Sequence, residues 1–258
     1  MIYATAPAVG TDGIKNAQLF VGKQSLVADV YPIKTDKSFV RALWDNIRKR
    51  GAMDTLMSDS AKSEISEKIQ DVCRYLMIKE RQSEPKYQHQ NPCERRWQNI
   101  KHNTTHLMNR LLVPAFCWLL ALNYVVYVMN HTAVASLSWR TPVEVLTGQT
   151  PDISPILQYQ FFEDVYYRNY YTSKGLGSDD ERAAWFVGFA ENVGHSMTYR
   201  VLSKETMELL CVSSLRRAAE GRNERADERA RNALQARGLD LRGMELQMDN
   251  DGNYVSLD

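Results

Sequence analysis

The chain has 258 residues, 44% of them hydrophobic and 24% charged, which is enough to bury the core of a soluble globular protein. Its formal net charge is only +1, so the overall charge indicates no nucleic-acid partner, and any basic surface has to be local. The four cysteines, Cys73, Cys93, Cys117 and Cys211, form no Cys-x-x-Cys pair. This pattern predicts neither a zinc site nor a disulfide framework and favours a reducing compartment.

The hydrophobic stretches predict neither secretion nor a membrane span. Residues 1–7 lack the basic and apolar segments of a signal peptide, so we expect the protein not to be secreted. The longest apolar run, from Leu111 to Met129, is interrupted by Pro114 and Asn123 and predicts a buried helix. We therefore expect an intracellular protein, in the nucleus or cytoplasm, without a membrane partner.

The first half of the chain predicts an α/β fold. Two strand-like runs at 17–22 and 26–31 flank a short polar turn and predict a hairpin. A helix capped by Asp36 or Ser38 is expected to run to about Arg50. Its apolar face would hold Phe39, Leu43, Trp44 and Ile47. A strand at 54–58, a helix at 63–75 and a strand beginning at Leu76 follow, and this alternation predicts a mixed sheet flanked by helices.

Two carboxylates stand at the ends of predicted elements. Asp59 follows the strand 54–58, at the end of a strand where ligands gather in such sheets. Beyond a polar loop at 81–90, Asn91 can cap a helix that Pro92 opens and that carries Glu94 in its first turn. Mg²⁺ prefers oxygen ligands and often takes only one or two carboxylates from a protein. Asp59 and Glu94 are therefore candidate metal ligands, although single carboxylates are more often solvated surface charges.

The helix that begins at Pro92 offers further polar groups beside Glu94. Glu94, Gln98 and Lys101 are spaced i, i+4 and i+7, so they share one helix face. This face combines a carboxylate, an amide and an ammonium group that can bind phosphate. Further positive charge comes from Arg95, Arg96 and His102. The alternative interpretation is an ordinary solvent-exposed helix.

The second half predicts a buried helix at 114–130, a short helix and then a β-rich region. Thr141 and Glu144 form a capping-box pattern for a helix that ends at Gly148. Strand-like runs at 161–167, 184–189, 197–202 and 208–212 predict a small β-rich module. Its aromatic residues could be core or a stacking platform for nucleic acid, and a core role is favoured. From Arg216 onward, alternating charges and few large apolar residues predict a solvated helix or disordered tail.

Five short motifs occur in an order that resembles a known family. They are Leu-Met-Ser-Asp-Ser-Ala at 56–61, Ser-Glu-Pro at 83–85, Gln-Asn-Pro-Cys-Glu-Arg-Arg at 90–96, Trp-Arg-Thr-Pro-Val-Glu-Val-Leu-Thr-Gly at 139–148 and Thr-Pro-Asp-Ile-Ser at 150–154. Together they resemble the integrase core of copia-type retrotransposons. The resemblance runs from about residue 15 to residue 167 and continues more weakly to residue 213.

This resemblance implies a ribonuclease-H-like fold and an Asp-Asp-Glu triad that binds Mg²⁺ or Mn²⁺. The implied activity is 3′-end processing and strand transfer of a cDNA into host DNA, carried out by a multimer. Asp59 matches the second Asp and Glu94 the Glu, as catalytic residues and metal ligands. Lys101 matches a basic position that contacts the DNA end, with Gln98 and Arg95 as further DNA-binding candidates. The expected domains are the catalytic core (1–155), the β-rich module (156–215) and the charged tail (216–258).

The sequence departs from the family at the first Asp of the triad. Residues 2–8, which could be the end of the first strand, hold no carboxylate. Asp12 lies in a predicted turn and Asp29 in the third strand, so neither matches. We therefore expect an N-terminally truncated core, starting just after the first Asp and lacking an upstream zinc-binding module, with impaired integrase activity. The alternatives are a non-catalytic nucleic-acid-binding module with the same fold and a nuclease of related architecture.

Overall fold

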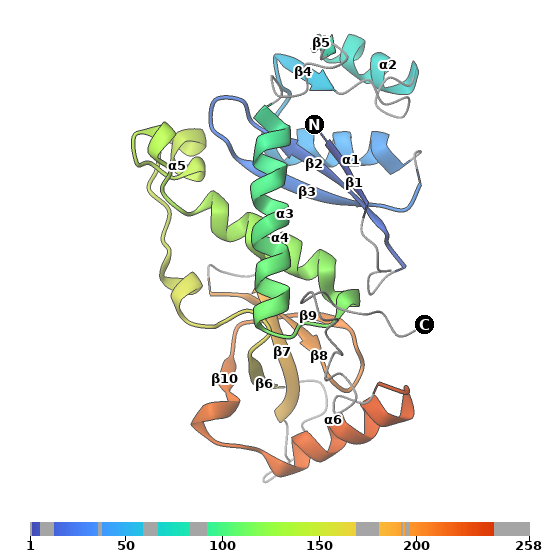
Figure 1. The fold of residues 1–258 in the computed structure, drawn as a ribbon, viewed down its shortest axis with the longest axis vertical. Helices are drawn as coiled ribbons and strands as arrows, with labels where there is room; N and C mark the ends of the chain where they lie inside the picture. Colours follow the sequence, from blue (N-terminus) through green and yellow to red (C-terminus); the bar gives the residue numbers. More distant parts are fainter. Residues whose placement is uncertain are drawn as a thin grey trace, which may run out of the picture. The chain divides into compact units, whose positions relative to one another are not determined.

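The computed structural model describes residues 2–5, 13–35, 38–58, 67–82, 92–168, 181–191, 193 and 197–239. They belong to two compact units (Figure 1). Unit 1 comprises residues 1–108 and 115–151, and unit 2 comprises residues 109–114 and 152–258. Each unit is described by itself, and the domain boundaries expected at residues 155 and 215 stay predictions.

Unit 1 begins with an antiparallel sheet in the order β1-β2-β3. Its strands are β1 (Ile2–Thr5), β2 (Asn16–Val21) and β3 (Ala28–Ile33). Strands β2 and β3 form the predicted hairpin, with Gln18 opposite Tyr31. Both faces of β2 are buried, so its side chains alternate between two cores rather than between core and solvent.

Helix α1 (Ser38–Arg50) leads into a parallel pair of strands. These are β4 (Thr55–Ser58) and β5 (Lys79–Gln82), joined through α2 (Glu67–Tyr75). The strand predicted to begin at Leu76 begins instead at Lys79. The reason is a turn that ends α2: Met77 has a φ of 56°, and the amide of Ile78 donates to the carbonyl of Cys73 at 2.8 Å.

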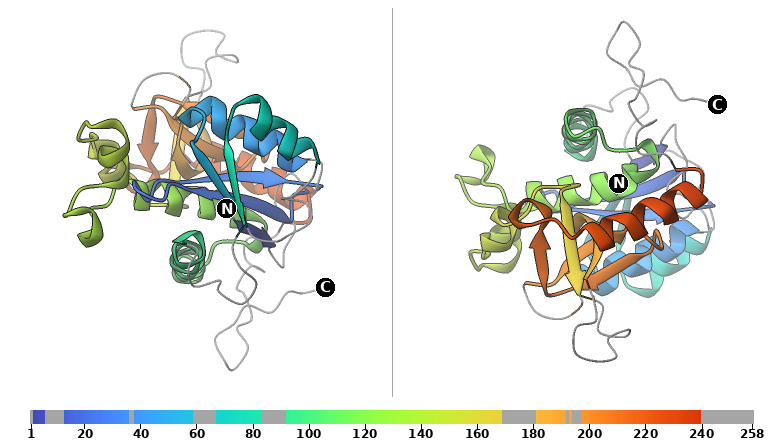
Figure 2. Two further views of the ribbon diagram at one scale, coloured as in Figure 1. Left: turned by 90° about the horizontal axis from the view of Figure 1, so that it is seen from above. Right: turned by 90° about the horizontal axis from the view of Figure 1, so that it is seen from below.

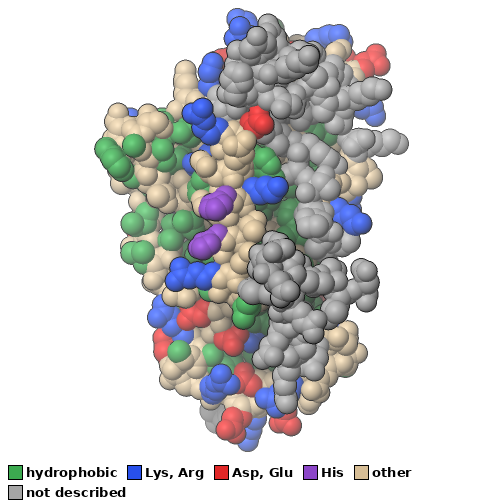
Figure 3. All heavy atoms as spheres, viewed as in Figure 1, with side chains coloured by type: hydrophobic (Ala, Val, Ile, Leu, Met, Phe, Trp, Pro, Cys, Tyr) green, Lys and Arg blue, Asp and Glu red, His purple; other side chains and the backbone are tan. Residues whose placement is uncertain are grey.

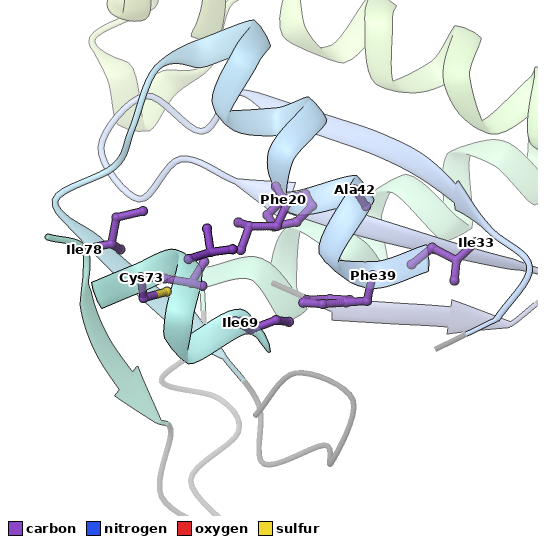
Figure 4. Packing of buried hydrophobic residues seen from close by; sticks show 10 residues of the cluster. Phe20, Ile33, Phe39, Ala42, Ile69, Cys73 and Ile78 are labelled. Atoms are coloured by element: carbon purple, nitrogen blue, oxygen red, sulfur yellow. The ribbon is translucent and has the colours of Figure 1, made fainter. Parts of the chain in front are cut away.

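Helices cover both faces of the three-stranded sheet (Figure 2). On one face, Phe20 and Ile33 pack against α1 and α2 (Figure 4). The residues of this core that the figure labels are Phe20, Ile33, Phe39, Ala42, Ile69, Cys73 and Ile78. On the other face, Ala17 and Leu19 pack against α3 (Pro92–Arg110) and α4 (Trp118–Asn130). The predicted α/β class, with helices flanking a sheet, is confirmed. Within the described residues of unit 1, however, the strands form an antiparallel three-stranded sheet and a separate parallel pair rather than the one mixed sheet expected.

A side-chain amide links α4 to β3 by hydrogen bonds. Asn130, the last residue of α4, is 4% exposed. Its amide nitrogen donates to the carbonyl of Ala28 at 2.8 Å, and its amide oxygen accepts from the Ala28 amide at 2.9 Å. This pair of bonds satisfies the backbone of Ala28, where β3 begins.

The predicted helix at 114–130 forms a 3₁₀ turn (Ala115–Cys117) followed by α4. In α5 (Pro142–Thr147) the predicted capping box is present, because Thr141 and Glu144 each accept a hydrogen bond from the other's backbone amide. Gly148 ends α5 with a φ of 75°. In the described part of the chain, no helix combines the length and apolarity needed to cross a membrane.

Unit 2 contains a five-stranded antiparallel sheet in the order β10-β6-β7-β8-β9. Its strands are β6 (Asp164–Arg168), β7 (Glu181–Phe189), β8 (Tyr199–Ser203), β9 (Leu209–Val212) and β10 (Leu215–Arg217). Phe186 is fully buried, and Tyr199 packs against it with ring centroids 5.9 Å apart. These two aromatic residues are therefore core rather than an exposed stacking platform.

The segment after Arg216, expected to be a solvated helix or a disordered tail, contains a helix, but one face of that helix is buried. Leu215–Arg217 form strand β10, and α6 (Glu224–Ala236) packs on the sheet. Ala226 and Ala230 contact Tyr166 and Ala183, and the Tyr166 hydroxyl donates to Asp227 at 2.8 Å. Small alanines let the helix approach the sheet closely, which the composition of the segment did not indicate.

Candidate active site

Asp59 itself lies outside the described residues, but the strand before it is described. Strand β4 ends at Ser58, which is buried, and pairs in parallel with β5. Asp59 therefore directly follows the carboxyl end of a parallel strand, the place where α/β sheets collect ligands. The position of its carboxylate stays a prediction.

Glu94 is the third residue of α3 and is half-buried. Its neighbours fix this end of the helix. The thiol of Cys93 is buried and donates to the carbonyl of Leu19 in β2 at 3.9 Å, and Ile100 is fully buried against the same sheet. Within the described residues, the Glu94 carboxylate has no hydrogen-bond or ion-pair partner. Among the described groups, none therefore competes with a cation for the two oxygens of Glu94.

Gln98 and Lys101 are exposed on the same side of α3 as Glu94. Successive helix residues are rotated by about 100°, which places Glu94 and Lys101 within about 20° of each other and Gln98 close beside them. This side flanks the face that Cys93 and Ile100 bury. The structure thus confirms the shared face that the i, i+4, i+7 spacing predicts.

Arg95 and Arg96 do not belong to that face. Arg95 is exposed but rotated by about 100° from Glu94. Arg96 is 8% exposed and donates to the carbonyl of Met129 at 3.2 Å, so the expectation that it adds positive surface charge is wrong. Burial lowers the pKa of its guanidinium. Helix α4 covers Arg96, and nothing in the local sequence of α3 indicates that contact.

The outer side of α3 carries a pair of imidazoles. His102 and His106 are exposed one helical turn apart and stack with ring centroids 6.4 Å apart. Figure 3 shows two imidazoles side by side on the viewed surface with basic side chains nearby. From the sequence, His102 was expected only as a source of local positive charge. The i, i+4 spacing could also have indicated its partner His106.

Asp29, the carboxylate of the third strand, is held in an ion-pair network. Arg50 binds it with two hydrogen bonds of 2.8 and 2.9 Å, and the Lys49 ammonium lies 2.9 Å from one of its oxygens. Burial alone would raise the pKa of Asp29, but Arg50 and Lys49 outweigh that effect and lower it. Asp29 therefore fastens β3 to the end of α1 and is not open to a metal ion.

Of the two carboxylates that the sequence suggests as metal ligands, only Glu94 lies among the described residues. In the described ranges, no three His, Cys, Asp or Glu side chains lie close enough together to hold a metal ion. Strand β1, which the resemblance implies as the position of the first Asp, carries no carboxylate. The groups that fit Mg²⁺ or Mn²⁺ are Glu94 and, by its place in the sequence, Asp59.

Comparison with known proteins gives backbone similarities only. No family model matches the sequence. No curated protein sequence matches it either. The catalytic core domain of BIV integrase has a TM-score of 0.44 at 16% identity, covering 57% of this chain and 91% of that one. The HTLV-2 integrase catalytic core domain in complex with magnesium, in its dimeric form, has a TM-score of 0.43 at 17% identity, with coverage of 57% and 91%.

A third solved structure is similar over more of the chain. It is a simian T-cell lymphotropic virus intasome in complex with the PP2A regulatory subunit B56 gamma. Its TM-score is 0.44 at 14% identity, with 78% of this chain and 74% of that chain covered. Because agreement and identity are this low, the function of this chain has to be argued from its own residues.

Proposed function

We propose that unit 1 is an integrase-type core whose reaction is metal-dependent phosphodiester strand transfer on DNA. The observation that carries the proposal is the flank of α3, where half-buried Glu94 shares one side of the helix with exposed Gln98 and Lys101. Asp59 supports it by its place at the end of β4. The specific reaction, strand transfer, is inferred from the five ordered motifs, which resemble the integrase cores of copia-type elements.

Each residue has a separate role in the proposal. Asp59 and Glu94 would hold Mg²⁺ or Mn²⁺, and a bound ion would stabilise the charge that develops on the attacked phosphate. The Lys101 ammonium would pair with a phosphate of the DNA end, and Gln98 would donate a hydrogen bond beside it. Arg95 would contact the backbone of the same DNA from the adjacent side of α3. By analogy with the family, the chain would act on DNA as a multimer.

We expect the strand-transfer activity of this chain to be weak. Strand β1 has no carboxylate, and Asp29 is held by Arg50 and Lys49, so neither supplies a third ligand. A site formed by Asp59 and Glu94 alone would hold a two-ion arrangement poorly, and its strand transfer should be slow. The same observation favours the second candidate, a non-catalytic nucleic-acid-binding module with the same fold.

Strand transfer on a labelled duplex with a recessed 3′ end distinguishes the two candidates. In Mn²⁺ we expect little product from the chain itself, more product when an Asp-bearing strand is added ahead of Met1, and none after Asp59→Asn or Glu94→Gln. If the extended chain remains inert and both variants bind the duplex normally, the non-catalytic module is favoured. Cleavage of an RNA–DNA hybrid would instead indicate a nuclease.

A further inference from the structure

Unit 1 has a second candidate binding surface on the outer side of α1. A groove of about 500 Å³ is open to solvent there. It lies between α1 and the first turn of α2, and we call it the α1 groove. Its lining residues are Val40, Arg41, Trp44, Asp45, Arg48 and Lys68.

Positive charge dominates the α1 groove. Arg41, Arg48 and Lys68 are exposed. Within the described residues, Arg41 and Lys68 have no hydrogen-bond or ion-pair partner. Arg48 lies 3.9 Å from the groove's one carboxylate, Asp45, in a pair whose side chains are 81% and 43% exposed. A pair this exposed contributes little, so three cations remain available to an anion.

The groove also contains an exposed aromatic ring. The sequence places Trp44 on the apolar face of α1, but the side chain is 37% exposed. Trp44 lies between Arg41 and Arg48, which are two helical turns apart, or roughly 10 Å along the axis. One stripe of α1 thus presents a cation, an indole and a second cation, with Lys68 beside them.

Charge and shape point to one kind of ligand. Cations that follow a groove bind successive phosphates, and an aromatic ring between them stacks on an unpaired base. A glutamate-rich peptide without aromatic residues would use the cations but has no ring to stack on the indole. A blunt duplex would use the cations but keeps its bases stacked inside. We propose that the α1 groove binds a single nucleic-acid strand, with a base on Trp44 and phosphates on Arg41, Arg48 and Lys68.

The proposal goes beyond the candidate active site. It involves α1 and α2, whereas Glu94, Gln98 and Lys101 belong to α3. It shares with the proposed function only the class of ligand, and strand binding in the α1 groove needs no metal ion. Asp59→Asn and Glu94→Gln should therefore leave it unchanged, which separates failure of one proposal from failure of the other.

The test measures the affinity of the chain for a fluorescein-labelled oligothymidine of about 12 nucleotides, a length within the usual site size. Binding is detected by fluorescence anisotropy in the absence of divalent ions. Replacing Arg41, Arg48 and Lys68 together by Gln should weaken binding at least tenfold. It should also reduce the magnitude of the slope of log K against log salt concentration by about 2, because each lost phosphate contact to a single strand accounts for about 0.7. The matched control replaces Lys23, Lys34 and Lys79, which are exposed in unit 1 outside the groove. It should change the affinity less than twofold.

Trp44 variants test the stacking contact. Trp44→Leu should weaken binding about five- to a hundredfold, and Trp44→Phe should retain most of it. Circular dichroism identifies any variant that fails to fold, and the Arg and Lys variants test the groove independently of Trp44. Equal weakening by the groove and control triplets would overturn the proposal. The proposal would also be overturned if an unlabelled competitor without exposed bases displaced the labelled strand as well as unlabelled oligothymidine does. The competitors to compare are an abasic strand, a blunt duplex and a glutamate-rich peptide.

Discussion

At the scale of single residues, the structure separates carboxylates that hold the fold from one that is open to a ligand. Asp29 is 6% exposed and bound by Arg50 and Lys49, whereas Glu94 is half-buried without such a partner in the described part of the chain. The chemical groups are nearly the same, and their surroundings decide the role of each. Asp29 should therefore affect stability, and Glu94 should affect ligand binding.

Asp29→Asn should lower the free energy of unfolding by about 3 kcal/mol at neutral pH, because it leaves two cations beside a neutral amide. The folded-state pKa of Asp29 lies below its ordinary value of 3.8. Its contribution is therefore complete above that value and is lost as the pH falls through the lowered pKa. Urea unfolding at a series of pH values should show the difference between the two proteins shrinking in acid. Asp45→Asn, which loses only the exposed pair with Arg48, should cost under about 0.5 kcal/mol.

The cysteines should differ in reactivity. Burial raises the pKa of the Cys117 thiol to about 12. The pKa of the Cys73 thiol is raised to about 11, mainly by burial. Cys211, in contrast, is exposed. A thiol reacts as its thiolate, so a brief treatment of the native protein with iodoacetamide at mildly alkaline pH should label Cys211 alone. Peptide mass spectrometry identifies the labelled sites. Equal labelling of Cys117 would show that the core around α4 is not closed.

At the scale of elements, the Asn130 side chain adds hydrogen bonds to the apolar packing of α4 on the sheet. Asn130→Ala would leave the buried amide and carbonyl of Ala28 without their partners, at roughly 2–4 kcal/mol for two buried groups. Chemical denaturation measures this loss. Asn130→Asp keeps the acceptor but not the donor, so it should still be destabilising. A loss below about 0.5 kcal/mol for Asn130→Ala would mean that water replaces the side chain at no cost.

Helix α6 provides a second test at this scale, because a solvated helix and a packed helix differ in their access to proteases. Leu234 is 2% exposed, and Arg229 donates to the backbone of Glu181 at 2.7 Å. Trypsin should therefore cleave α6 slowly in the native protein. Leu234→Ala, at about 2–4 kcal/mol, should make α6 a fast cleavage site. Rapid cleavage at Arg229 and Arg231 in the unsubstituted chain would restore the sequence-based expectation of a solvated tail.

Some features of the helices were predictable from the sequence, and others were not. The capping box of Thr141 and Glu144 and the start of α3 at Pro92 were predictable because they depend on residues a few positions apart. Three other features were not predictable from the sequence: the burial of Arg96, the packing of α6 through alanines and the exposure of Trp44. Each of these depends on which element lies opposite, and local periodicity does not contain that information.

At the scale of the whole molecule, a net charge of +1 conceals local concentrations of charge. The three cations of the α1 groove and Lys101 on α3 are offset by acidic residues elsewhere in the chain. Nucleic-acid binding should therefore depend on individual side chains rather than on the overall field. For the candidate active site, the sequence predicted the shared side of α3, whereas the place of Asp59 beside it stays a prediction.

The most direct test of the proposed active site is Mn²⁺ binding, measured from the electron paramagnetic resonance signal of the free ion. We expect the chain to bind Mn²⁺, and we expect Asp59→Asn and Glu94→Gln each to weaken binding roughly tenfold or more, because each removes one of two ligands. Glu208→Gln, a change at an exposed carboxylate of unit 2, should leave binding unchanged. If all three variants bind Mn²⁺ as the unsubstituted chain does, or if that chain binds none, Asp59 and Glu94 are not a metal site.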